Sequence, residues 1–126
     1  MVEDMERVFS EAGANALLPT IITLLGRLRD AHRKLLAVGR SAGRRAASNG
    51  SPSLGAAAGE SELAYAEVVS EIEALGVIVR DPESGLVDFA AVRGDQQICL
   101  CWRLGEDRLG FWHPRDSGFA GRRPLE

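Results

Sequence analysis

Residues 76–92 decide the fold, and they read Gly-Val-Ile-Val-Arg-Asp-Pro-Glu-Ser-Gly-Leu-Val-Asp-Phe-Ala-Ala-Val. After Gly76 the spacing of the apolar residues changes to a period of two, which is typical of strands, and the Asp-Pro-Glu-Ser-Gly stretch is typical of a turn. Later segments repeat this pattern. We therefore predict strands over residues 77–80, 86–92, 98–103 and 109–113, joined by tight turns into an antiparallel β-meander over residues 77–113.

Helices are predicted upstream of this meander. Ser10 and Glu11 are typical of a capped helix start, and Pro19 indicates either a kink or the start of a second helix. Beyond it, apolar spacings of four and three indicate one face of a long helix that reaches about residue 40, carried by Ile21, Leu25, Leu28, His32 and Leu35. A further helix is predicted over residues 60–76, ended by Gly76.

The connection between the helices has a different composition. Residues 41–59 consist mainly of glycine, alanine and serine, with Pro52 near the centre, and we predict a flexible connection there. It overlaps the end of the predicted helical region, residues 10–47, because the alanine runs on either side could extend both helices.

At 126 residues, of which 45% are hydrophobic, the chain has the size and composition of one folded domain spanning residues 1–126. The predicted class is α+β. We expect a long antiparallel helical hairpin with a short N-terminal helix, packed on a C-terminal antiparallel β-meander of three to four strands. An ordered C-terminal segment, residues 114–126, follows the meander.

Composition disfavours several classes of protein. No apolar run is long enough to span a membrane, and the acidic N-terminus lacks the features of a signal peptide, so we expect a cytoplasmic protein without membrane contact. Cys99 and Cys101 alternate on one predicted strand. A disulfide between them would be strained, and we expect two reduced, buried thiols.

Charge is distributed unevenly along the helices, although the net charge is only −3. Residues 60–73 contain five glutamates and no basic residue, whereas residues 20–47 contain, against Asp30 alone, the basic residues Arg27, Arg29, Arg33, Lys34, Arg40, Arg44 and Arg45. Antiparallel pairing would set these arginines beside the glutamates, within the chain or across a homodimer. Nucleic-acid binding by the basic helix is the less favoured alternative.

Five sequence blocks resemble a known family. They are Phe9-Ser-x-x-x-Ala-Asn-Ala-Leu-Leu-Pro, Glu73-Ala-Leu-Gly-Val, Gly85-Leu-Val-Asp-Phe, Leu100-Cys-Trp-Arg-Leu-Gly-Glu and Trp112-His-x-x-x-x-Gly-Phe-Ala-Gly-Arg-Arg-Pro-Leu. Together they resemble the bacterial family called domain of unknown function 2203, over nearly the whole chain. The resemblance implies long helices and a small sheet. It implies no activity and no catalytic residues.

The candidate site lies in residues 112–124, Trp-His-Pro-Arg-Asp-Ser-Gly-Phe-Ala-Gly-Arg-Arg-Pro. His113 could be a general acid or base that Asp116 orients. The forked donors of Arg122 and Arg123 could bind a carboxylate or phosphate beside Trp112. In the competing interpretation, Arg122 pairs with a carboxylate of this chain and the segment only packs on the core.

A metal site is a further alternative. His113 and Asp116 could be joined as ligands by Cys99, Cys101 or Asp88, but the spacing matches no standard zinc signature. We therefore predict no metal and no cofactor.

The leading functional hypothesis is a non-enzymatic binding or interaction module. Its helices would assemble as a homodimer, and the sheet edge with the C-terminal segment would form a small pocket for an anionic ligand. The alternative is a small enzyme that acts on an anionic substrate, with His113 as the acid or base and Arg122 as the anion clamp. The sequence contains no complete catalytic set and does not decide between them.

Overall fold

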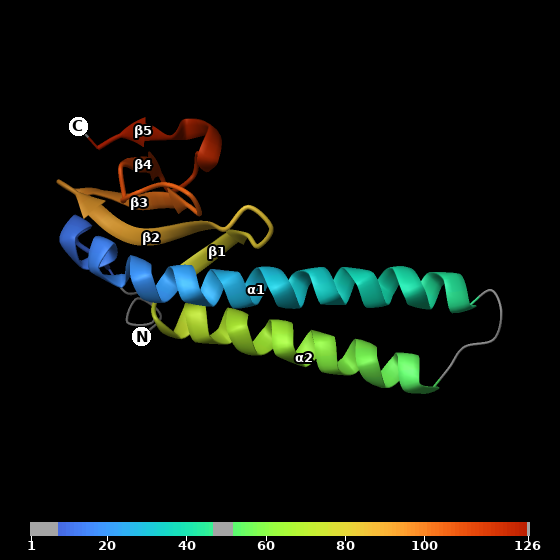
Figure 1. Ribbon diagram of the computed structural model, residues 1–126. Helices are drawn as coiled ribbons and strands as arrows, with labels where there is room; N and C mark the ends of the chain where they lie inside the picture. Colours follow the sequence, from blue (N-terminus) through green and yellow to red (C-terminus); the bar gives the residue numbers. More distant parts are fainter. Residues whose placement is uncertain (1–7, 47–51, 126) are drawn as a thin grey trace.

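Two helices lie beside an antiparallel sheet in the computed structural model, which describes residues 8–46 and 52–125 (Figure 1). The helices are α1 (Glu11–Ala46) and α2 (Pro52–Ala74). The five strands follow one another in the sheet in chain order: β1 (Val77–Asp81), β2 (Leu86–Arg93), β3 (Gln96–Arg103), β4 (Phe111–Pro114) and β5 (Arg123–Pro124). The α+β class is confirmed, with five strands in place of the expected three to four.

The expected short N-terminal helix does not form, because α1 runs unbroken through Pro19. The helix begins at a serine cap, in which Ser10 Oγ accepts a hydrogen bond of 3.0 Å from the backbone N–H of Gly13. Proline removes one backbone hydrogen bond from a helix, and burial of the apolar stripe on both sides of it offsets that loss. The stripe consists of Ala14, Leu18, Ile21, Leu25 and Leu28, each no more than 5% exposed.

Most of the predicted flexible connection is helical. Helix α1 continues to Ala46 and α2 begins at Pro52, so residues 41–46 and 52–59 extend the two helices in place of the expected flexible connection, while residues 47–51 lie outside the described residues. Alanine is the strongest helix former, and proline is well suited to a first helical turn. The alanine runs therefore lengthen both helices. None of the helices in the described part of the chain combines the length and apolar composition needed to cross a membrane.

The sheet register divides the strands into two faces. The face toward the helices carries three opposed apolar pairs of β2 and β3, and all six side chains are buried: Val87 with Trp102, Phe89 with Leu100, and Ala91 with Ile98. Figure 1 shows α1 and α2 side by side below this face, and the core lies between them. The opposite face carries Asp88, which lies across from Cys101.

Strand β5 was not expected from the sequence. Arg123 and Pro124 pair with Trp112 and Phe111 of β4, and the backbone N–H of Leu125 donates a 2.9 Å hydrogen bond to the carbonyl of Gly110. These bonds hold the end of the described chain along the outer edge of the sheet. The C-terminal segment consequently supplies side chains to both faces.

Candidate functional site

A buried aspartate–histidine pair lies on the sheet face away from the helices. Asp88 and His113 are each 1% exposed, and they are the buried charged or polar side chains of the described residues. His113 Nε2 lies 3.1 Å from both carboxylate oxygens of Asp88. Its Nδ1 lies 2.7 Å from the carbonyl oxygen of Pro114. A carbonyl only accepts hydrogen bonds, so Nδ1 carries a hydrogen.

An arginine compensates the buried charge of Asp88. Arg80, on the edge strand β1, donates a 2.7 Å hydrogen bond from Nε to Asp88 Oδ2. This hydrogen bond is the largest cause of a raised pKa for Arg80. Burying a carboxylate without such partners costs free energy, because the charge loses its contact with water. Arg80 and His113 together compensate for this loss at Asp88.

A second ion pair fastens the C-terminal segment to the sheet. Arg122 donates from both terminal nitrogens to Glu106, at 2.8 and 2.6 Å, and its guanidinium lies 4.2 Å from the ring centroid of Phe111. Burial opposes ionisation of Glu106. The hydrogen bonds from Arg122 and from the backbone N–H of Arg103 outweigh it, so the pKa of Glu106 is lowered. Arg122 thus pairs with a carboxylate of the same chain, which is the second of the two interpretations that the sequence allowed for this residue.

The thiol of Cys101 lies beside these groups. Arg122 donates from Nε to its Sγ at 3.3 Å, but burial dominates and raises the pKa of Cys101 to about 11. Cys99 and Cys101 are both free and buried. Only the thiolate is a strong nucleophile. In the absence of a metal, therefore, Cys101 is an inert thiol near neutral pH.

A cluster of two exposed arginines around a buried tryptophan lies on the other face, at the β4–β5 edge. The guanidinium carbon of Arg93 is 4.6 Å from the ring centroid of Trp112, and that of Arg123 is 5.3 Å from the same ring. Both arginines are exposed, whereas Trp112 is buried. We call these three residues the arginine–tryptophan cluster.

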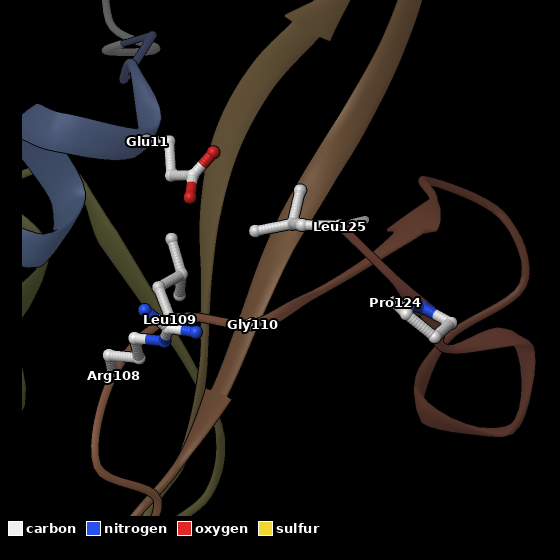
Figure 2. Close-up of a pocket in the computed structure, with 6 residues that line it drawn as sticks. All are labelled: Glu11, Arg108, Leu109, Gly110, Pro124 and Leu125. Atoms are coloured by element: carbon white, nitrogen blue, oxygen red, sulfur yellow. The ribbon is translucent and has the colours of Figure 1, made fainter.

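A hollow of about 210 Å³ adjoins this cluster (Figure 2). Figure 2 shows the carboxylate of Glu11, from the start of α1, across from the side chain of Arg108, with the Leu125 side chain pointing toward the same space. The complete lining is Glu11, Arg108, Leu109, Gly110, Pro124 and Leu125. We call it the β4–β5 hollow. Because Leu125 directly follows β5, the hollow and the cluster are neighbours along one edge.

The structure separates the residues of the sequence-predicted site. His113 contacts Asp88, while Asp116 is exposed and is not among the hydrogen-bond partners found for His113 in the described residues. Arg122 faces Cys101 and Glu106 on one side of the sheet, and Arg123 faces Trp112 on the other. His113 and Arg122 thus lie on a different face from Trp112 and Arg123.

Sequence reasoning considered Asp88 only as a possible metal ligand, and it missed the roles of Arg80, Glu106 and Arg93. Asp88 did carry a signal, because it is a charged residue inside an otherwise apolar predicted strand, whereas Arg80 ends its predicted strand and is exposed. Burial of such a residue requires a charged partner. Glu106 and Arg93 lie in turns or strand ends, where charges are ordinary, and the sequence gives no sign of their roles.

The basic and acidic helices pair within the chain. Arg27 of α1 donates two hydrogen bonds, of 3.1 and 2.8 Å, to Glu71 of α2. Arg33 and His32 instead contact Glu83, in the turn between β1 and β2. The helical charges therefore fix both the helix pair and its position against the sheet.

Comparison with known proteins gives a family and no activity. No curated protein and no solved structure matches the chain. A family model described as "Uncharacterized conserved protein (DUF2203)" matches residues 7–125, which is nearly the whole chain. The chain therefore belongs to the DUF2203 family of uncharacterized conserved proteins.

Proposed function

We propose that the protein is a non-enzymatic binding module for a small anionic ligand, which binds at the arginine–tryptophan cluster and the adjoining β4–β5 hollow. One observation carries the proposal. Arg93 and Arg123 both lie against Trp112, yet within residues 8–46 and 52–125 no carboxylate forms an ion pair with either of them. Two like charges held at one ring favour an anion between or beside them.

The chemistry of these side chains suits a carboxylate or a phosphate. A guanidinium that stacks on an aromatic ring keeps its edge free for two parallel hydrogen bonds to such a group. Stacking also restricts the side chain before the ligand arrives, which lowers the ordering cost of binding. Arg108 adds a third exposed cation at the hollow, again without an ion-pair partner among the described residues.

The β4–β5 hollow limits the size of the ligand. Its volume of about 210 Å³ lies below the range of roughly 300–1,000 Å³ that holds drug-sized molecules. Glu11 lines the wall across from Arg108 (Figure 2). The preferred ligand is therefore small, carries its negative charge toward Arg93 and Arg123, and presents a hydrogen-bond donor toward Glu11.

The enzyme alternative has less support. A general acid or base must reach the proton that it transfers, and His113 is 1% exposed with both ring nitrogens already in contact with oxygen atoms. The guanidinium of Arg122, the proposed anion clamp, is held by Glu106. Both residues are better suited to supporting the structure than to turnover.

Calorimetric titration with inorganic phosphate and with acetate tests the ligand class. We expect saturable binding to the full chain, weakened about tenfold by Arg123→Gln or Arg93→Gln, since each loses a charge-assisted hydrogen bond. Arg103→Gln is the matched control, because Arg103 is also exposed and also lies over an aromatic ring, that of Phe119, on the other face. Equal binding by all three variants would refute the proposal.

We also propose that the helices assemble as a homodimer. The ion pair between Arg27 and Glu71 fixes the antiparallel register, which places Leu36 and Leu63 at the same level of the helix pair. These leucines are 45% and 67% exposed, and the helices extend beyond the sheet (Figure 1). Burial of both in a dimer would remove apolar surface from water. A monomeric mass at all protein concentrations, in low and high salt, would contradict this assembly.

A further inference from the structure

Three potential metal ligands converge on the sheet face away from the helices. Asp88 of β2, Cys101 of β3 and His113 of β4 each offer one ligating atom, and these atoms all lie within 4.8 Å of one another. Asp88 lies directly across from Cys101 of β3, and His113 lies across from Cys99, which is two residues before Cys101 in β3. Three adjacent strands therefore present a carboxylate, a thiol and an imidazole to one point.

The hydrogen bonding of His113 matches that of a metal-bound histidine. A metal-ligating imidazole almost always donates its other N–H to a carbonyl or carboxylate, which fixes the tautomer. Here Nδ1 donates to the Pro114 carbonyl at 2.7 Å. Nε2 then points between the two oxygens of Asp88, at 3.1 Å from each. These atoms fit an imidazolium that donates from Nε2 to Asp88, and they equally fit a metal ion that takes the place of this hydrogen between the ring and the carboxylate.

The distance between the His113 and Asp88 ligand atoms is close to that of a tetrahedral site. Zinc bonds of about 2.0–2.3 Å in tetrahedral geometry place neighbouring ligand atoms roughly 3.2–3.8 Å apart. The 3.1 Å between Nε2 and Asp88 is near this range, and no two ligand atoms of the cluster are more than 4.8 Å apart. Sheet strands hold the three backbones in place, so any rearrangement is confined to side chains.

Outer hydrogen bonds already orient two of the three ligands. Arg80 donates to Oδ2 of Asp88 at 2.7 Å, which leaves Oδ1 for a metal. Arg122 donates to Sγ of Cys101 at 3.3 Å, a contact that stabilises a thiolate. Such outer partners tune metal affinity by roughly 10- to 100-fold.

We propose that Asp88, Cys101 and His113 bind a divalent transition-metal ion, with Zn²⁺ as the ion of choice. A thiolate, an imidazole and a carboxylate form a mixed set that suits zinc, whereas calcium and magnesium prefer oxygen ligands alone. Binding replaces the thiol hydrogen and any hydrogen on Nε2, and both leave as protons. Where Nε2 carries a hydrogen, two protons are exchanged for one divalent ion and the net charge of the site is unchanged.

Cobalt substitution tests the ligand set on the full chain. Because the ligands are buried, the metal-free protein is refolded with Co²⁺ present. We expect one equivalent to bind with a thiolate-to-cobalt absorption band, and Zn²⁺ to displace it. Cys101→Ser should lose the band, and the matched control Cys99→Ser should keep it. Absence of the band in the wild type, or its loss in the Cys99→Ser control, would overturn the assignment.

A measurement without variants covers the case in which Cys101→Ser fails to fold. X-ray absorption of the zinc-loaded wild type should show a sulfur at about 2.3 Å beside nitrogen or oxygen ligands at about 2.0–2.1 Å. A coordination shell without sulfur would refute the site. Arg80→Gln should weaken Co²⁺ binding roughly 10- to 100-fold, and an unchanged affinity would contradict the role of Arg80.

Discussion

Replacement of Glu106 by glutamine tests the ion pair that fastens the C-terminal segment to the sheet. Glu106 accepts two hydrogen bonds from Arg122 and one, of 2.8 Å, from the backbone N–H of Arg103. Glutamine keeps the shape of the side chain but loses its charge. One of its two terminal atoms becomes a donor that faces the guanidinium of Arg122, so one of the three hydrogen bonds is lost and the other two are weakened.

The size of the effect follows from the exposure of the pair. Breaking a fully buried ion pair costs about 3–5 kcal/mol. The side chains of Arg122 and Glu106 are 12% and 20% exposed, so water compensates part of the loss, and we expect about 2 kcal/mol. The entropy of unfolding is about 0.26 kcal/mol/K for a chain of this length. The melting temperature should therefore fall by about 8 °C.

The pH dependence has a definite sign. The pKa of Glu106 is lowered in the folded protein, against a value of 4.5 for an unperturbed glutamate. The carboxylate therefore contributes stability above the unfolded pKa, and this contribution is lost as the pH falls through the folded pKa. The difference between the wild type and Glu106→Gln should be full near neutral pH and should vanish in acid.

Urea unfolding of both proteins across this pH range measures the difference directly. Asp107→Asn is the matched control. Asp107 is the adjacent exposed carboxylate, and its variant should stay within about 0.5 kcal/mol of the wild type. A loss of less than 0.5 kcal/mol for Glu106→Gln at neutral pH, or a loss that does not change with pH, would refute the reasoning.

Two further predictions concern the turns and the thiols. Gly85→Ala should lower the free energy of unfolding in urea by about 2–4 kcal/mol, because Gly85 has a φ of +71° and an added Cβ would lie 2.6 Å from Leu104 Cβ. The control Gly94→Ala, at a φ of +62° with no neighbour within 4 Å, should lower it by only about 1 kcal/mol. Equal losses for the two variants would contradict the role of the close contact. Iodoacetamide should modify neither Cys99 nor Cys101 in the native protein, because burial raises the pKa of both thiols. In urea it should modify both cysteines. Rapid modification of the native chain would contradict their burial.

Much of the fold could be predicted from local patterns. The period-two spacing located β1 to β4 to within a few residues, because the face of the sheet toward the helices is apolar and successive strand residues alternate between faces. Helix α1 was misjudged at Pro19, since the cost of one proline is local and the compensating burial of Leu18 and Ile21 is set by tertiary packing. Strand β5 has only two residues and leaves no periodic pattern to detect.

The candidate site was less predictable, because it depends on strand register. His113 was identified from sequence, but its partner Asp88 lies 25 positions away. The two meet only through the pairing of β2 with β3 and of β3 with β4. Arg122 and Arg123 are neighbours in sequence, and the sequence analysis favoured Arg122 as the anion clamp. Strand β5 directs Arg123 toward Trp112, while Arg122 turns to Glu106 on the other side.

The most direct test of the proposed function is an NMR titration of the full chain with inorganic phosphate. The account predicts saturable shifts confined to the backbone amides around Arg93, residues 108–112 and residues 123–125, which surround the arginine–tryptophan cluster and the β4–β5 hollow. Shifts that do not saturate, or that gather around Arg33 or Arg103 instead, would contradict it.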